Sequence, residues 1–509
     1  MLHKIVSCSA RDNRFVTCSD GTEKGIEMAE KLLYELSQKG RHGVRLPKLD
    51  VEKSALLPDT LLRKEEAPLP EVSEPDALRH FTRLSILNHH VDKGFYPLGS
   101  CTMKYNPKLN EKVSGMPLFA DLHPFVPTEY CQGALQLMYD LEGYFKKITG
   151  FSDVTLQPPA GASGELTGLM LMKKYHTDRG DTKRTKVIIP DSSHGTNPAT
   201  IAFAGLEVVE IPSGPDGKLD PDAIREHADD TLVGLMVTNP NTLGIFESKI
   251  HEVAKIVHDV GGFMYMDGAN LNALLGITTP KALGFDVMHI NVHKTFSTPH
   301  GGGGPGSGPV CCTEELAPYL PVPTVKKDGD FYYQDWNNPK SIGKMQGFYG
   351  NFLVLVRALT YMYSNGKEGL ENISRTAILN ANYIRKALEA DYELPYKDHC
   401  LHEVVFSADR QAELGVRALD IAKRLLDFGV HAPTVYFPLI VHEAMMIEPT
   451  ETESKETLDE FIGYMKQIAK EAKENPEILH EAPVTTPVRR LDEALAARKP
   501  VVKYEPSEN

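Results

Sequence analysis

Short runs of apolar residues, separated by helical or loop segments, fill the chain between about residues 150 and 315. Runs this brief, with almost no polar position inside them, are typical of strands in a parallel sheet that is covered on both faces. Residues 250–260 instead repeat an apolar side chain every three or four positions and end at Gly261, which predicts a helix that crosses between two strands. The middle of the chain is therefore predicted to be α/β, with strands at residues 187–189, 208–211, 233–237, 263–266 and 287–290.

The segments on either side of this region differ in pattern. A helix is predicted at 132–148, and another at 22–38 precedes a stretch rich in Pro and Glu that does not support a core. After about residue 370 helices (377–390, 415–429 and 455–472) alternate with strands (402–407 and 434–440), which predicts a small α+β domain. We therefore expect an N-terminal arm (1–75), a large α/β domain (76–370), a small C-terminal α+β domain (371–485) and a tail (486–509).

Charge and composition narrow the class of protein. The 509 residues carry a formal net charge of −14, which argues against nucleic acid as a partner, because such binding needs a concentrated basic surface. No apolar run is long enough to cross a bilayer and the N-terminus lacks the apolar stretch of a secretion signal, so no membrane partner and a cytoplasmic location are expected. The seven cysteines are scattered, without the spacing of a zinc site, so no metal is expected.

Two residues of opposite charge follow neighbouring predicted strands. Asp267 comes directly after residues 263–266, and Lys294 follows residues 287–291 within a few positions. Strand ends face the ligand crevice in an open α/β sheet, so both side chains are expected in one site. A lysine against an apolar strand loses part of its hydration, which frees its amine to attack an aldehyde. This pair is what pyridoxal phosphate (PLP) requires, namely a covalent anchor and a partner for its ring nitrogen.

Three further segments surround the predicted pair. Residues 161–164 (GASG) precede a helical run, and small residues at a helix N-terminus leave backbone N–H groups free to bind phosphate. His194 lies in DSSHGTNPA, just beyond a third strand, and its imidazole is expected on one face of the cofactor ring, with Thr196 beside it. The loop HGGGGPGSGP (300–309) lacks the order of a nucleotide-binding P-loop, and its glycines are expected to allow a close approach to Lys294.

Six motifs together resemble the glycine decarboxylase P-protein family, in its PLP-bearing half. They cover most of residues 75–450 and read YPLGSCTMKYNP, LQPPAGASGELTG, PDSSHGTNPA, VTNPNTLGIFE, MDGANLNA and NVHKTFSTPHGGGGPG. The resemblance implies a PLP-dependent transferase of fold type I, with a mostly parallel seven-stranded sheet in the large domain and a small α+β domain after it.

The resemblance also implies a role for particular residues. Lys294 would hold PLP as a Schiff base, Asp267 would pair with the ring nitrogen and His194 would stack on the ring. Ala162 and Ser163 would bind the phosphate, with Thr196 and His293 as further cofactor contacts. Substrate contacts are expected from Tyr96, Ser100, Cys101, Thr102 and His300, while His293, His300 and Arg357 are candidates for gripping the glycine carboxylate.

The implied reaction is decarboxylation of glycine, with release of CO2 and transfer of the aminomethyl group to the lipoyl group of the H-protein. Because the chain resembles only one half of the longer P-protein, a related subunit 1 is the expected partner, in an α2β2 tetramer. Two alternatives stay open at this point. One is an aminotransferase, aldolase or decarboxylase for a larger substrate, and the other is a scaffold subunit that kept the fold without the chemistry.

Overall fold

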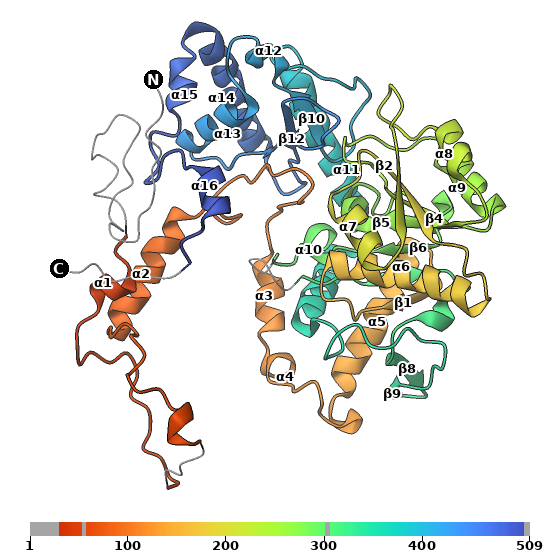
Figure 1. The fold of residues 1–509 in the computed structure, drawn as a ribbon, viewed down its shortest axis with the longest axis horizontal. Coiled ribbons are helices and arrows are strands. Elements are labelled where there is room, and N and C mark those ends of the chain that lie inside the picture. The colour runs from red at the N-terminus through yellow and green to blue at the C-terminus, as the bar shows by residue number, and fades with distance from the viewer. Residues whose placement is uncertain (1–29, 53–56, 301–305, 503–509) are drawn as a thin grey trace. The chain divides into compact units, whose positions relative to one another are not determined.

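The computed structural model describes residues 30–52, 57–300 and 306–502, and the chain divides into two compact units (Figure 1). Residues 1–90 and 481–509 form the first unit, and residues 91–480 form the second. Within the first unit, α2 (Glu74–Leu87) begins where the Ser73 hydroxyl accepts the Asp76 N–H. Its other described helices are α1 (Leu33–Leu36), η2 (Asp59–Leu61) and α16 (Glu493–Arg498).

The helix predicted at 22–38 lies only partly within the described residues. Positions 22–29 of the expected helix at 22–38 lie outside them, and of positions 30–38 only Leu33–Leu36 are helical. The Pro-rich stretch after this helix exposes many large apolar side chains, including Leu46, Leu61 and Leu69. Residues 503–509 of the tail also lie outside the described residues.

A seven-stranded sheet in the order β1-β7-β6-β5-β4-β2-β3 is the centre of the second unit. Six strands run in one direction, and β7 alone of the seven runs against them and pairs antiparallel with both of its neighbours. The five strands predicted from the sequence are all present, whereas β1 and β7 were not predicted. Their bounds are β1 (Asp153–Thr155), β2 (Lys186–Pro190), β3 (Glu207–Ile211), β4 (Leu232–Thr238), β5 (Phe263–Asp267), β6 (Val287–His289) and β7 (Val310–Cys312).

Successive residues of the central strands enter two different cores, because side chains alternate between the faces of a sheet. In β5, Met264 and Met266 join the core packed by α5 (Gln132–Thr149) and α9 (Ile250–Asp259). Phe263 and Tyr265 join the core packed by α6 (Gly161–Asp178) and α7 (Thr196–Phe203). The sheet is therefore covered on both faces, which confirms the α/β prediction.

Helix α11 (Phe352–Leu388) leads from the large sheet to a smaller one, in the order β10-β12-β11. It is much longer than the predicted helix at 377–390, and Gly366, at φ 63°, interrupts its helical geometry. Strand β12 was not predicted, and β11 is shorter than the expected strand at 434–440. The elements of this part are β10 (Val404–Ser407), α12 (Asp409–Ala412), α13 (Ala418–Asp427), β11 (Thr434–Val435), β12 (Ala444–Ile447), α14 (Lys455–Glu474) and α15 (Glu477–Glu481).

Shorter elements complete the second unit. They are α3 (Lys108–Ser114), α4 (Pro117–Ala120), η3 (Thr128–Tyr130), α8 (Pro221–His227), η4 (Gly268–Ala273), η5 (Lys281–Leu283), α10 (Val292–Thr295), η6 (Ala317–Tyr319), β8 (Thr324–Asp328) and β9 (Phe331–Asp335). Within the described ranges, no helix is both long enough and apolar enough to cross a membrane.

A buried lysine joins several of these segments. The Lys104 ammonium, whose side chain is 0% exposed, lies 2.8 Å from the Glu451 carboxylate. It also donates to the Asn272 side chain at 2.9 Å and to the Thr295 carbonyl at 2.8 Å. Residue 272 belongs to the turn after Asp267, and Thr295 follows Lys294 directly. One ammonium therefore connects the backbones on which Asp267 and Lys294 lie.

Replacing Lys104 with methionine is expected to lower the free energy of unfolding by about 3 kcal/mol, because the Glu451 charge would stay buried without its partner. Urea unfolding measures the loss. Lys108→Met is the control, since Lys108 pairs with Asp92 at an exposed position and such pairs contribute less than about 1 kcal/mol. Adding Glu451→Gln to Lys104→Met should recover part of the loss. Equal losses in the two single variants would contradict the role assigned to the buried pair.

Candidate functional site

A cavity of about 320 Å³ lies at the carboxyl ends of the parallel strands, beside the N-terminus of α6. Thr238 and Asp267, the last residues of β4 and β5, both line it. Most of the predicted site residues also line it, from segments far apart in the chain: Ser100, Cys101, Ala162, His194, Thr196, His293, Lys294 and His300. The structure thus brings the predicted residues together where an open α/β sheet binds its ligands.

Lys294 lies in the short helix α10, which two residues separate from the end of β6. Its side chain is half-buried and lines the cavity. His293 and His300 line the cavity with Lys294, and their ring centroids are 4.9 Å apart. Burial lowers the pKa of His293 to about 3 and also lowers the pKa of His300. Both imidazoles are therefore neutral near pH 7.

The Asp267 carboxylate is buried and accepts several hydrogen bonds. Its Oδ1 accepts the Ala269 N–H at 2.9 Å and lies 3.3 Å from His289 Nε2, and its Oδ2 accepts Asn197 Nδ2 at 3.0 Å. Burial alone would raise the pKa of this carboxyl, but the His289 imidazole, the Asn197 amide and the Lys294 ammonium hold it below its usual value. Asp267 is thus an ionised acid at the floor of the cavity.

His194 lies between β2 and α7, and its ring orientation is set by Thr196. The Thr196 N–H donates to His194 Nδ1 at 3.2 Å, and the Thr196 hydroxyl lies 2.9 Å from the same nitrogen. Because Nδ1 accepts a backbone hydrogen bond, the proton of the neutral ring is on Nε2. Burial and the Lys294 charge lower the pKa of His194, so the ring is an uncharged, flat surface in the cavity wall.

The cavity fits an anion at one end and an aromatic nitrogen at the other. Helix α6 has no side-chain cap at Ala160, so its first N–H groups have no side-chain acceptor, and its first residues, Gly161 and Ala162, line the cavity, as in a phosphate site. Gly161 is needed there, because a Cβ atom would lie 2.6 Å from Asn291 Nδ2. Among the described residues, Thr238 Oγ1 and Asn291 Oδ1 are buried, line the cavity and have no hydrogen-bond partner within the protein. The donor set therefore fits PLP.

A turn at residues 100–102 forms another wall of the cavity. Ser100 and Thr102 have φ of 60° and 47°, a left-handed conformation that non-glycine residues rarely adopt. Two buried acids hold it: Glu403 accepts the Ser100 N–H at 2.8 Å, and Glu448 accepts the Thr102 N–H at 2.9 Å. The neighbouring carbonyl of Cys101 lies 3.0 Å from His300 Nε2.

Four predicted residues do not line the cavity. Tyr96 stacks on His431 with ring centroids 4.0 Å apart, and Thr102 is buried against Glu448. Ser163 is half-buried in the first turn of α6. Arg357 donates two hydrogen bonds of 2.8 Å to Glu111, so its guanidinium is already paired with a carboxylate of the protein.

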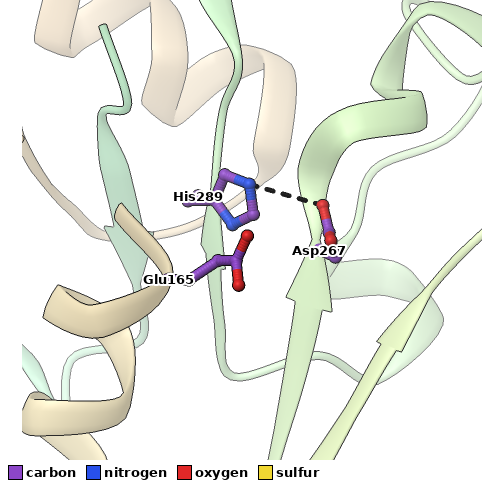
Figure 2. Close-up of side chains that lie close together, drawn as sticks. All are labelled: Glu165, Asp267 and His289. Carbon is purple, nitrogen blue, oxygen red and sulfur yellow. Dashed lines mark ion pairs between the residues drawn. The ribbon is translucent and has the colours of Figure 1, made fainter. Parts of the chain in front are cut away.

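Glu165 and His289 are buried beside Asp267, and sequence reasoning did not identify either as a site residue. Figure 2 shows the three side chains converging from α6, β5 and β6. Tyr265 extends the group, since its hydroxyl lies 3.0 Å from His289 Nδ1. The only signal in the sequence was an acid at the fifth position of a helix that is otherwise small and apolar at that end.

A second buried group contains His402, Glu403 and Glu448. His402 is 0% exposed, and burial together with the Lys294 charge lowers its pKa from 6.5 to about 3. Because the folded protein binds this proton less readily than the unfolded chain, the stability from neutral His402 is full above pH 6.5 and is lost as the pH falls toward about 3.

Between about pH 3 and pH 6.5, acidification should lower the unfolding free energy of a His402→Leu variant less steeply than that of the unsubstituted protein. The slope should differ by up to about 1.4 kcal/mol per pH unit, because one titrating group is removed. Urea unfolding at a series of pH values measures the slope. His402→Gln, which also cannot titrate, should show the same reduced slope. An unchanged slope in both variants would contradict the buried neutral imidazole.

Comparisons with known proteins agree with this geometry. Residues 373–484 match the family described as glycine dehydrogenase, C-terminal domain, and residues 170–308 match the aminotransferase class-V family. The probable glycine dehydrogenase (decarboxylating) subunit 2 of Halalkalibacterium halodurans is 58% identical over 94% of this chain and 98% of its own length. The protein of the same name from Pyrococcus horikoshii is 57% identical over 93% of this chain and 96% of its own length.

Solved structures support the fold. A glycine decarboxylase (P-protein) of the glycine cleavage system, in inhibitor-bound form, aligns with a TM-score of 0.68 at 18% identity over 81% of this chain and 93% of its own. The glutamate decarboxylase of Lactobacillus brevis aligns with a TM-score of 0.61 at 15% identity over 85% of this chain and 96% of its own. The fold type I prediction is thereby confirmed. With relatives above half identity over almost its whole length, the chain belongs to the family of glycine dehydrogenase (decarboxylating) subunit 2.

Proposed function

We propose that this protein is the PLP-bearing subunit of a glycine decarboxylase, with the cofactor held covalently at Lys294. The observation that carries the proposal is that Lys294, Asp267 and His194 line one cavity, which is bounded at its other end by the start of α6. A lysine, an ionised acid, a neutral imidazole and an uncapped helix N-terminus match the four parts of PLP, namely its aldehyde, ring nitrogen, ring face and phosphate.

Each of these groups has a defined task in the proposed reaction. When bound, PLP supplies a sink for the electrons of the breaking carbon–carboxylate bond. Asp267, kept ionised by its neighbours, would pair with the ring nitrogen and keep it protonated. His194 would contact the ring without adding charge, and the backbone N–H groups of Gly161 and Ala162 would hold the phosphate. The Lys294 amine would exchange with the amino group of the substrate and move a proton.

The wall opposite the sheet favours a small substrate. Ser100, Cys101 and His300 lie there, and the lining residues that the structure describes include no arginine to hold a second carboxylate. This supports glycine over a dicarboxylic amino acid. The product CO2 then leaves, and the aminomethyl group passes to the lipoyl group of an H-protein.

The family name of subunit 2 supports a partner subunit 1, and we propose an α2β2 tetramer in the cytoplasm. The exposed leucines of the arm (1–75) are the surface that we assign to that partner. The boundaries at 75, 370 and 485 stay predictions; α11 runs through residue 370 without ending there.

Exchange between labelled CO2 and the glycine carboxyl tests the proposal. The protein is loaded with PLP and mixed with subunit 1 and lipoylated H-protein, and glycine is compared with L-alanine and L-glutamate. Exchange is expected with glycine alone and only when all three proteins are present. A fully loaded complex that exchanges no glycine carboxyl would overturn the glycine assignment, and exchange with L-glutamate instead would favour the larger-substrate alternative.

A further inference from the structure

Glu165 is 3% exposed and lies one turn beyond the N-terminus of α6. The helix comes unusually close to the sheet here, because two of its glycines face bulky strand residues. A Cβ atom on Gly164 would lie 2.7 Å from His289, and one on Gly168 would lie 2.3 Å from the Tyr265 ring. This close approach brings the Glu165 carboxyl to the level of the cavity floor beside Asp267 (Figure 2).

Two consecutive residues of α7 connect Glu165 to both walls of the site. The Thr196 hydroxyl lies 2.8 Å from Glu165 Oε1, while the Thr196 N–H donates to His194. The Asn197 amide donates one hydrogen to Glu165 Oε2 at 3.1 Å and the other to Asp267 Oδ2 at 3.0 Å. The Glu165 carboxyl is thus linked to His194 through Thr196 and to Asp267 through Asn197.

The hydrogens available around the two acids favour a proton on Glu165. The Thr200 hydroxyl has one hydrogen and two possible acceptors, the Thr196 carbonyl at 2.7 Å and Glu165 Oε2 at 3.2 Å. With that hydrogen in the shorter bond, a hydrogen on a protonated Glu165 completes the longer one. Asp267 instead receives donors at both oxygens. Burial and the nearby Asp267 also raise the pKa of Glu165, whereas the pKa of Asp267 is lowered.

We propose that Glu165, as a neutral carboxylic acid, is a positioning residue that ties His194 and Asp267 to the helix whose N-terminus binds the cofactor phosphate. The proposal rests on the function proposed above, but it concerns cofactor binding and not glycine. It assigns the negative charge of the cavity floor to Asp267 alone. It also makes α6 the element that aligns the phosphate, ring face and ring nitrogen contacts at once.

Two substitutions separate the hydrogen bonds of Glu165 from its charge. Glu165→Gln keeps an acceptor toward Thr196 and a donor toward Thr200 and loses only the acceptor for the Asn197 amide, so its PLP dissociation constant should stay within about threefold of the unsubstituted protein. Glu165→Leu removes both, and its affinity for PLP should fall on the order of tenfold. The absorbance of bound PLP, titrated against pH, should follow the unsubstituted protein in the Gln variant and shift in the Leu variant.

The same variants are also compared without cofactor, by the NMR signals of the imidazoles in histidine-labelled protein. A His194→Gln variant identifies the signal of His194. That signal should move in Glu165→Leu and stay in Glu165→Gln. Glu142→Gln is the control, because burial raises the pKa of Glu142 to about 8 on α5, away from the cavity, and no PLP readout should change.

Two outcomes would overturn the proposal. If Glu165→Gln weakens PLP binding as much as Glu165→Leu, the charge is required and Glu165 is not neutral. If Glu165→Leu leaves both PLP affinity and the His194 signal unchanged, it positions nothing. If the glycine exchange fails, the PLP affinity and the His194 signal can still be measured. If the unsubstituted protein does not bind PLP, the proposed function is wrong. The histidine spectrum without cofactor then still tests the link between Glu165 and His194.

Discussion

Replacing Lys294 with alanine is expected to abolish covalent retention of PLP and to lower glycine-dependent CO2 exchange by about 10²- to 10⁴-fold, the range that a positioned proton-transfer group contributes. Lys294 is the one lysine among the described residues that line the cavity, so no neighbouring amine replaces it. The visible absorbance of the loaded protein and its loss on borohydride reduction report the covalent link, and mass spectrometry locates the modified residue.

Lys281→Ala is the matched control for this experiment, since Lys281 is exposed on η5, outside the cavity. It should keep the absorbance band and the exchange rate. A Lys294→Ala protein that bound PLP normally and supported full exchange would instead revive the alternative of a scaffold subunit.

An Asp267→Asn substitution is expected to lower the exchange rate by about 10²- to 10³-fold, on the scale of losing one preorganised electrostatic group. The amide keeps the shape of the carboxylate but cannot hold a proton on the ring nitrogen. It also places an N–H group where Asn197 or Ala269 now donates, so one of these donors loses its acceptor. The rate with glycine at saturation should fall more than the affinity for PLP.

The control for this charge is Asp259→Asn, at the exposed end of α9, where Asp259 pairs only with Lys255 at the surface. Its exchange rate should equal that of the unsubstituted protein. An Asp267→Asn rate within threefold of normal, with PLP fully bound, would contradict the assigned role of Asp267 in protonating the ring.

The strands that position the site could be predicted because each carries a strong local signal. Residues 263–266 and 287–290 are short, mostly apolar runs, and each is followed within a few positions by a charged residue. The topology rule for open sheets then places Asp267 and Lys294 at one edge. The structure confirms the strands and places both side chains on one cavity, while their roles stay predictions.

Elements that depend on distant partners could not be predicted. Strands β1 and β7 have three residues each, too few to show a period, and they exist because they pair with each other across the chain. Only the last part of helix α11 was predicted, at 377–390, because Gly366 and Gly369 weaken the helical pattern before it. Glu165 could not be assigned to the site either, since its link to Asp267 joins positions 102 residues apart (267 minus 165) and passes through Asn197.

The left-handed turn at Ser100 and Thr102 makes one wall of the cavity dependent on the smaller sheet. Such a conformation costs about 1–3 kcal/mol per residue and persists only while its surroundings hold it. Here the restraint comes from Glu403, directly before β10, and Glu448, directly after β12. The shape of this wall is therefore fixed by carboxylates that lie more than 300 residues further along the chain.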